Sequence, residues 1–181
     1  MTNIKQRSKD WKSGVSKTIT FIVTKDCQLA CKYCYLVGKN SKERMSFGIA
    51  KKAIDYILAH ENDMPEESVV FDFIGGEPFL EIDLIDKICD YLKIEMFRLN
   101  HHWFNSFRFS FSTNGINYHE KKIQDFIKKN RNHLSIGITI DGTEKSMILT
   151  EYTRFLLKVH TKTLPKTFHF GYNNFQMQQQ K

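Results

Sequence analysis

The sequence of 181 residues lacks a long apolar run, because no stretch of 18 consecutive apolar residues occurs in it. A helix that crosses a bilayer needs about 20 such residues, so we expect no membrane partner. The first 17 residues, MTNIKQRSKDWKSGVSK, also lack the apolar core of an export signal. We therefore expect a cytoplasmic protein.

The chain also lacks a basic core, although its formal net charge is +7. Residues 1–17 carry five basic and one acidic side chain, residues 145–181 carry six and one, and residues 18–144 carry sixteen and eighteen. The positive charge therefore lies at the two ends, which argues against a nucleic-acid partner. The length, with 41% apolar residues and 15 Phe, suffices for one hydrophobic core.

The middle of the chain does contain an alternation of short apolar runs and amphipathic segments. The runs 18–24, 68–74, 107–115 and 134–142 have the length and the β-branched or aromatic content of strands. Strands that alternate with helices form parallel sheets, in which functional loops gather at the carboxyl ends of the strands. The pattern predicts an α/β fold.

Three segments between these runs have the spacing of amphipathic helices. The first helix follows Ser46, a suitable N-cap, and the second is expected to begin at Asp83. Asn117 and Glu120 resemble a capping box for the third helix. Cys89 lies on the apolar stripe of the second helix, so we interpret it as a core residue rather than a ligand.

The other three cysteines, Cys27, Cys31 and Cys34, lie in the segment TKDCQLACKYCYL, directly after the first expected strand. Cysteines in a chain with no export signal indicate metal or redox chemistry before they indicate disulfides. Cubane iron–sulfur clusters are usually held by four cysteines. Three thiolates in one loop hold three irons of a 4Fe-4S cluster and leave the fourth iron open to another ligand.

Two other uses of these cysteines remain open. A structural zinc site would add one of the seven His residues, although such sites favour two C-x₂₋₄-C pairs and the chain has no second pair. A thioredoxin-like use of Cys31 and Cys34 is the other alternative. That motif opens a helix and would leave Cys27 without a role.

The motif CQLACKYC resembles the cysteine signature of the radical S-adenosylmethionine (SAM) superfamily, and it stands where that family has it, after the first strand of a partial (β/α)₆ barrel. The resemblance implies that the three cysteines ligate a 4Fe-4S cluster, that SAM chelates the open iron, and that Tyr33 lies near the adenine. About four of six βα units are then present. An electron from the cluster cleaves SAM to a 5′-deoxyadenosyl radical in this family.

Two further motifs resemble the family at later strand ends. The first is GGEP, which comprises Gly75, Gly76, Glu77 and Pro78. In the family, its backbone carbonyls and its Glu receive the SAM amino group, although GGEP alone would be interpreted as a tight turn. The second is STNG, where Ser112 and Asn114 would face the ribose, although such residues are common turn formers.

The stretch IDG, with Asp141 and Gly142, fits the subgroup of radical SAM enzymes that modifies peptides and carries a C-terminal SPASM-type domain for auxiliary clusters. The resemblance implies a maturase of cysteine-rich ribosomal peptides, with a peptide substrate and a reductant such as a flavodoxin or ferredoxin. A sulfatase-maturing enzyme is the alternative within the family. A non-catalytic iron–sulfur or zinc-binding protein is the alternative outside it.

Residues 145–181 do not continue this pattern: they lack Ala and Asp, contain one acidic residue and show no sustained helical or strand period. The subgroup continues instead with segments like KHD-x-NR and GSYEDV-KNIPLWL. Suitable synonymous codons for the segments 145–154 and 158–181 encode KHDINRVYK and GSYEDVAKNIPLWLQQFPNATTK in another reading frame. We therefore expect a frameshift near Glu144, and a genuine divergent C-terminus is the alternative.

This hypothesis divides the chain into three parts. Residues 1–17 form a polar segment, 18–144 a partial barrel, and 145–181 an out-of-frame tail. A partial barrel leaves an open sheet edge. We therefore expect the truncated chain to be poorly stable and inactive as an enzyme.

Overall fold

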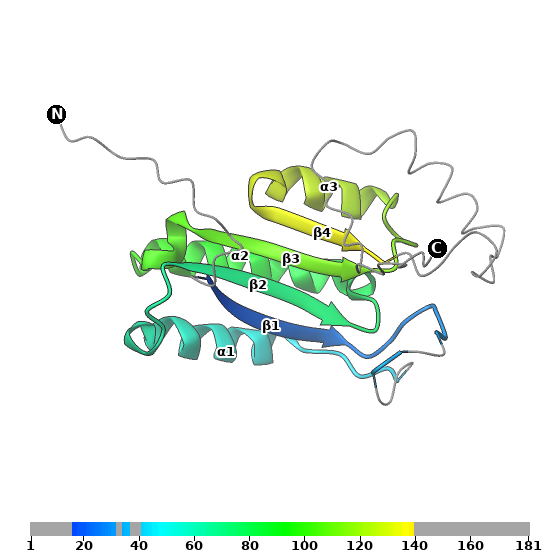
Figure 1. Ribbon diagram of the computed structural model, residues 1–181, viewed down its shortest axis with the longest axis horizontal. Helices are drawn as coiled ribbons and strands as arrows, with labels where there is room; N and C mark the ends of the chain where they lie inside the picture. The colour runs from blue at the N-terminus through cyan, green and yellow to red at the C-terminus, as the bar shows by residue number, and fades with distance from the viewer. Residues whose placement is uncertain (1–15, 32–33, 37–40, 140–181) are drawn as a thin grey trace, which may run out of the picture.

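The computed structural model describes residues 16–31, 34–36 and 41–139. Within them, four strands form one sheet in the order β1-β2-β3-β4. The strands are β1 Ser16–Thr24, β2 Ser68–Gly75, β3 Phe107–Thr113 and β4 Leu134–Ile138. Every neighbouring pair is parallel, because a helix connects each strand to the next (Figure 1). The expected α/β fold is confirmed.

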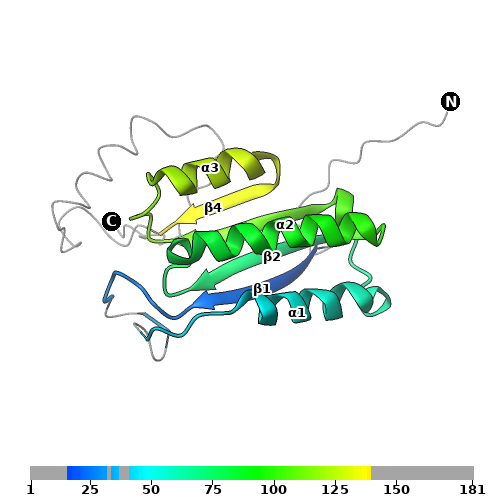
Figure 2. The same cartoon turned by 180° about the vertical axis from the view of Figure 1, so that it is seen from behind.

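The three helices α1 Phe47–Ala59, α2 Ile82–Arg98 and α3 Lys121–Asn130 cover one face of this sheet (Figure 2). Ser46 caps α1 as expected, because its side-chain oxygen accepts a hydrogen bond from the N–H of Ile49. Helix α2 begins at Ile82, directly before the expected start at Asp83, and Asp83 lies in its first turn.

The expected capping box before α3 is wrong. Glu120 is itself the N-cap of α3 and makes no side-chain cap hydrogen bond. The Asn117 amide donates instead to the Glu120 carboxylate, and the Glu120 N–H donates to the Asn117 carbonyl oxygen at 3.0 Å. A turn thus occupies the residues that the capping box required, and the helix starts after it.

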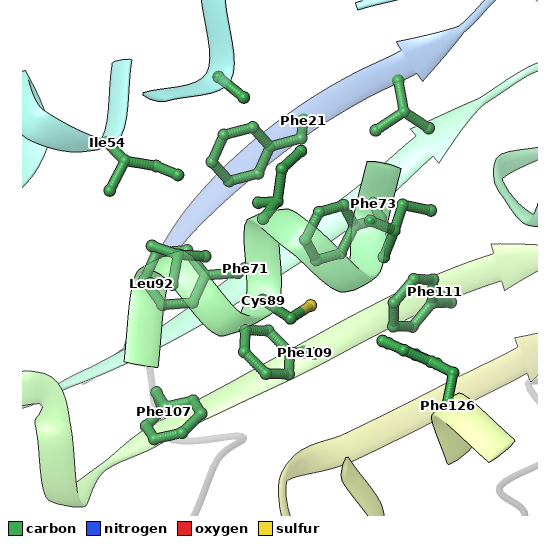
Figure 3. Packing of buried hydrophobic residues seen from close by; sticks show 14 of the residues in the cluster. Phe21, Ile54, Phe71, Phe73, Cys89, Leu92, Phe107, Phe109, Phe111 and Phe126 are labelled. Carbon is green, nitrogen blue, oxygen red and sulfur yellow. The ribbon is translucent and has the colours of Figure 1, made fainter. Parts of the chain in front are cut away.

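Aromatic rings from the strands form the core between sheet and helices (Figure 3). Phe73 of β2 stacks on Phe21 of β1 and on Phe111 of β3, with ring centroids 5.4 Å and 5.1 Å apart. Cys89 of α2 lies among these rings, and burial raises the pKa of its thiol well above the ordinary value. Cys89 is a core residue, as the sequence predicts.

No described helix covers the opposite face of the sheet (Figures 1 and 2). Thr20, Asp72, Ser110 and Ser135 lie in register across the four strands. Because side chains of a strand alternate between faces, this row lies on the face away from the Phe residues of the core. We call these four residues the polar row.

The start of β1 differs from the sequence-based expectation, and the expected C-terminal part of the chain is not described. β1 begins at Ser16, so the strand reaches into the expected polar segment 1–17. Asp141, Gly142 and the tail 145–181 lie outside the described residues. No helix in the described part of the chain is long and apolar enough to cross a membrane.

Candidate functional site

The carboxyl ends of β1, β2 and β3 bring three predicted motifs to one edge of the sheet. The cysteine segment follows Thr24, GGEP begins at Gly75 at the end of β2, and Asn114 follows Thr113 at the end of β3. Because the strands are parallel and adjacent, residues that are far apart in sequence meet at this edge.

The two glycines of GGEP are required by the chain's own backbone. A Cβ atom at Gly75 would lie 2.1 Å from the carbonyl oxygen of Thr24, and one at Gly76 would lie 2.1 Å from that of Asp26. The Gly76 N–H donates to Thr24 O at 2.9 Å, and the Glu77 N–H donates to Asp26 O at 2.8 Å. Gly75 also has a φ of +149°, which disfavours any side chain. The glycine pair thus lets the cysteine segment begin in contact with the end of β2.

Glu77 is buried, with 1% of its surface exposed, and its carboxylate joins the ends of β2 and β3. One oxygen accepts from the Phe79 N–H at 3.0 Å and from the Thr113 hydroxyl at 2.7 Å. The other accepts from the Asn114 N–H at 2.8 Å. Burial raises the pKa of Glu77 and outweighs these three hydrogen bonds, which lower it.

Pro78 continues this connection as the first residue of the 3₁₀ turn Pro78–Glu81. Its fixed φ and missing N–H suit the first position of a helical turn. Pro78 is buried, and the next residue, Phe79, packs its ring on Phe111 with centroids 5.7 Å apart. The turn therefore anchors GGEP to the core.

The cysteine segment is closed at its base by the chain that returns toward α1. The Lys25 N–H donates to Glu43 O at 3.1 Å, and the Met45 N–H donates to Val23 O at 2.9 Å. Thr24 and Arg44 form an antiparallel bridge between these two contacts. The thiols are thus carried on a loop whose two ends are held together beside GGEP.

Cys27, Cys31 and Cys34 are partly exposed thiols without a disulfide. The Cys34 N–H donates to Cys31 O at 3.2 Å, so these two residues lie in a turn. Neither residue lies in a described helix, whereas a thioredoxin-like pair opens one. The Leu29 N–H donates to the sulfur of Cys27 at 3.4 Å.

Among the described residues, Cys27, Cys31 and Cys34 do not form a group whose sulfurs all lie within 4.8 Å of one another. Sulfurs that share one zinc ion lie about 3.8 Å apart, as the Zn–S distance and tetrahedral angles require. Among the described residues, the side chains with all ligand atoms within 4.8 Å of one another are Glu61, His101 and His102, at the opposite end of the strands. In a cubane each cysteine binds a different iron, so the sulfurs that hold a cluster lie farther apart than those that share one zinc ion.

The other predicted SAM contacts are Ser112, Asn114 and Tyr33, and they differ in exposure and in their neighbours. Ser112 is exposed on the face of the sheet that carries the polar row. Asn114 is half-buried, and its amide nitrogen lies 3.8 Å from Cys27 Sγ and 3.4 Å from Gln28 Oε1. Tyr33 lies outside the described residues. Sequence reasoning missed Thr113, which donates to Glu77, because nothing in the spacing of STNG distinguishes it.

Sequence comparison with known proteins shows the family to which the chain belongs. The profile of the radical SAM superfamily matches residues 21–163, so the chain belongs to that superfamily. A relative from Methanocaldococcus jannaschii, an uncharacterised protein, is 38% identical over 136 residues. The match covers 75% of this chain and 42% of that protein, so the chain spans less than half of the relative's length.

Solved structures of the enzyme anSMEcpe share the fold. The structure with bound AdoMet and the Kp18Cys peptide has a TM-score of 0.58 at 19% identity, covering 81% of this chain and 40% of that chain. The structure with AdoMet and the Cp18Cys peptide has a TM-score of 0.52 at 23% identity, covering 72% and 32%. At these identities the likeness establishes the partial-barrel fold.

Proposed function

We propose that the chain forms the cluster- and SAM-binding part of a radical SAM enzyme. The observation that carries the proposal is the loop with Cys27, Cys31 and Cys34, which is closed at its base and held against GGEP at the carboxyl edge of the sheet. In the proposal the three thiolates hold a 4Fe-4S cluster, and SAM binds the remaining iron. When bound, the cluster supplies the electron that cleaves SAM, and SAM supplies the radical.

The other residues of the edge position this loop. Gly75 and Gly76 admit the backbone of Thr24 and Asp26, and Glu77 ties that contact to β3. Because Glu77 is buried and its carboxylate already accepts three hydrogen bonds, we propose that the backbone of GGEP receives the SAM amino group and that Glu77 holds this backbone in place. Tyr33 is proposed to contact the adenine, and Ser112 and Asn114 are proposed to contact the ribose.

The substrate that we propose is a peptide. The polar row lies on the face of the sheet that no described helix covers, and the carboxyl edge of this sheet carries the thiols. The hydroxyls of the polar row can bind peptide N–H and C=O groups, and the Asp72 carboxylate can accept from peptide N–H groups. anSMEcpe has been solved with bound peptides, which accords with this choice. We favour maturation of a cysteine-rich ribosomal peptide, with a flavodoxin or ferredoxin as reductant, and keep sulfatase maturation as the second candidate.

Anaerobic reconstitution with iron and sulfide tests the proposed cluster. We expect the wild-type chain to bind about four irons and four sulfides, and each of Cys27→Ala, Cys31→Ala and Cys34→Ala to lose them. Cys89→Ala is the matched control. Because the Cys89 thiol is buried in α2, this substitution should leave iron binding unchanged. Tight zinc binding without sulfide incorporation would refute the proposal.

Formation of 5′-deoxyadenosine tests the reaction separately. A reconstituted chain that is reduced with dithionite and given SAM should release 5′-deoxyadenosine if the described edge suffices for cleavage. A chain that assembles the cluster and binds SAM without releasing this product is a non-catalytic iron–sulfur protein. If the chain does release 5′-deoxyadenosine, adding a cysteine-rich peptide should change the yield of 5′-deoxyadenosine only when the enzyme is a peptide maturase.

We also infer a frameshift near Glu144, with residues 18–144 as the in-frame domain. The support is the family-like order of residues in the alternative frame, although the family match continues past this point to residue 163. Sequencing the locus decides between the two readings. A nucleotide sequence that cannot encode HD-x-NR in the adjacent frame leaves residues 145–181 as a genuine divergent segment.

A further inference from the structure

Two N–H groups from different parts of the chain lie against the sulfur of Cys27. The Leu29 N–H donates to Cys27 Sγ at 3.4 Å from within the cysteine segment. The side-chain amide of Asn114 donates to the same sulfur at 3.8 Å from the end of β3, 87 residues away in sequence. The first contact is local, whereas the second exists only because β1 and β3 end at the same edge.

The Asn114 amide is held in the orientation that directs its nitrogen at Cys27. Its side-chain oxygen Oδ1 accepts a hydrogen bond from the Ile116 N–H at 2.9 Å. Its backbone N–H donates to the buried carboxylate of Glu77 at 2.8 Å. Because the oxygen is engaged by Ile116, the Nδ2 group is the part of the amide that remains for the sulfur.

A series of side-chain hydrogen bonds also holds Gln28, the residue after Cys27, in place. The Asn114 amide donates to Gln28 Oε1 at 3.4 Å, the Gln28 amide donates to Asn117 Oδ1, and the Asn117 amide donates to Glu120. These contacts join the cysteine segment to the turn before α3. Cys27 is therefore held by side chains of the β3–α3 connection in addition to its own loop.

We propose that Asn114 sets the reduction potential of the cluster through its hydrogen bond to the Cys27 sulfur. The inference rests on the proposed function, because it requires the thiolate to ligate iron. The reduced cluster carries one more negative charge than the oxidised cluster, and part of that charge lies on the cysteine sulfurs. An N–H donor at the sulfur therefore stabilises the reduced form more and raises the potential.

The test is a redox titration of the reconstituted full chain with its Asn114 variants. Asn114→Ala removes the donor, and we expect a lower midpoint potential. Asn114→Asp keeps an oxygen for the Ile116 N–H but replaces the donor by a negative charge, so its potential should fall further. Asn105→Asp is the matched control: Asn105 is exposed and lies at the opposite end of β3, so the same change there should leave the potential unchanged.

A spectroscopic measurement distinguishes an effect on sulfur from a loosened fold. Loss of an N–H···S contact strengthens the Fe–S bond of that cysteine, so resonance Raman spectra of Asn114→Ala should show a terminal Fe–S stretch at higher frequency. Gln28→Ala removes the neighbouring amide and leaves Asn114 in place. Its potential should shift less than that of Asn114→Ala.

The outcomes separate this inference from the proposed function. A wild-type chain that assembles no cluster refutes the proposed function. A wild-type cluster whose potential and Fe–S stretch are both unchanged in the two Asn114 variants refutes the role of Asn114 alone. If neither variant assembles a cluster that the wild type assembles, Asn114 serves assembly and the proposed effect on potential is wrong.

Discussion

The carboxyl and amino ends of β2 and β3 use their buried polar contacts to different effect. At the carboxyl ends, the buried Glu77 accepts three hydrogen bonds and supports a loop of partly exposed thiols. At the amino ends, Trp103 donates from its indole to Glu66 O at 2.6 Å, and His102 contacts the same carbonyl at 3.0 Å. His101 is buried beneath them and caps the Trp103 N–H.

The difference lies in what each end leaves accessible. The amino end closes on itself, because the His101, His102 and Trp103 rings pack together with centroids 4.6 to 5.2 Å apart. Burial lowers the pKa of His101, which favours its neutral form there. At the carboxyl end, the buried contacts position a loop whose cysteines are partly exposed. Fold and candidate function thus occupy opposite ends of the same strands, as is common in barrels.

The largest effect is expected from Gly76→Ala at the carboxyl end. The new Cβ would lie 2.1 Å from Asp26 O, so the cysteine segment must move. We expect the free energy of unfolding to fall by about 3 kcal/mol and iron binding to be lost. Gly48→Ala is the matched control, because its Cβ would lie 3.9 Å from Ser46 Oγ. Equal iron binding in both variants, measured after reconstitution, would contradict the tight approach.

Glu77→Ala should have the next largest effect. Three donors lose their acceptor in a buried site, which costs about 2 kcal/mol of unfolding free energy in chemical denaturation. Thr113→Val removes one of these donors and should cost about 1 kcal/mol. The two changes should not add, because they remove the same hydrogen bond. Additive losses would show that Glu77 and Thr113 act independently.

Glu77→Gln sharpens the comparison through pH. The folded-state pKa of Glu77 is raised above the ordinary 4.5, so its protonation favours the folded state. The resulting stability is fully present below pH 4.5 and is lost as the pH rises through the raised pKa. The stability of the wild type relative to Glu77→Gln should therefore increase on acidification. If the difference in unfolding free energy between the wild type and Glu77→Gln stays constant with pH, this expectation is wrong.

The smallest effect is expected at the amino end, from Glu61→Gln. The hydrogen bond from His102 lowers the pKa of Glu61, but the pair is partly exposed and screened by solvent, so we expect a loss of about 0.5 kcal/mol at neutral pH. This stability is present above the ordinary pKa of 4.5 and is lost as the pH falls through the lowered pKa. The pH dependence is thus opposite in sign to that of Glu77, and iron binding should not change.

Much of the fold was predictable because it depends on short-range patterns. The short apolar runs predicted the four strands, and the apolar stripe of α2, with Ile85, Cys89 and Leu92, was predicted and is buried. The start of α3 was predicted wrongly, because Asn117 and Glu120 fit either a capping box or a turn. The structure adopts the turn, in which the Glu120 N–H donates to Asn117 O.

The candidate site was predictable as a set of motifs, and its contacts were not. The sequence predicts a SAM contact or a tight turn at GGEP, but not that its glycines approach the carbonyl oxygens of Thr24 and Asp26. It places Asn114 near a bound ribose by resemblance, whereas the structure adds a contact with Cys27. The roles of Tyr33, Ser112 and Asn114 in SAM binding stay predictions.

The sequence by itself determined the order of strands and helices, the aromatic core and the three thiols of one loop, because helical and strand periods and motif spacings are local properties. Only the tertiary structure decided that Glu77 bonds to Thr113 and Asn114, 36 and 37 residues away, and that Asn114 reaches Cys27. Such contacts depend on the register of parallel strands, and that register is set by how the side chains of all the strands pack against the helices.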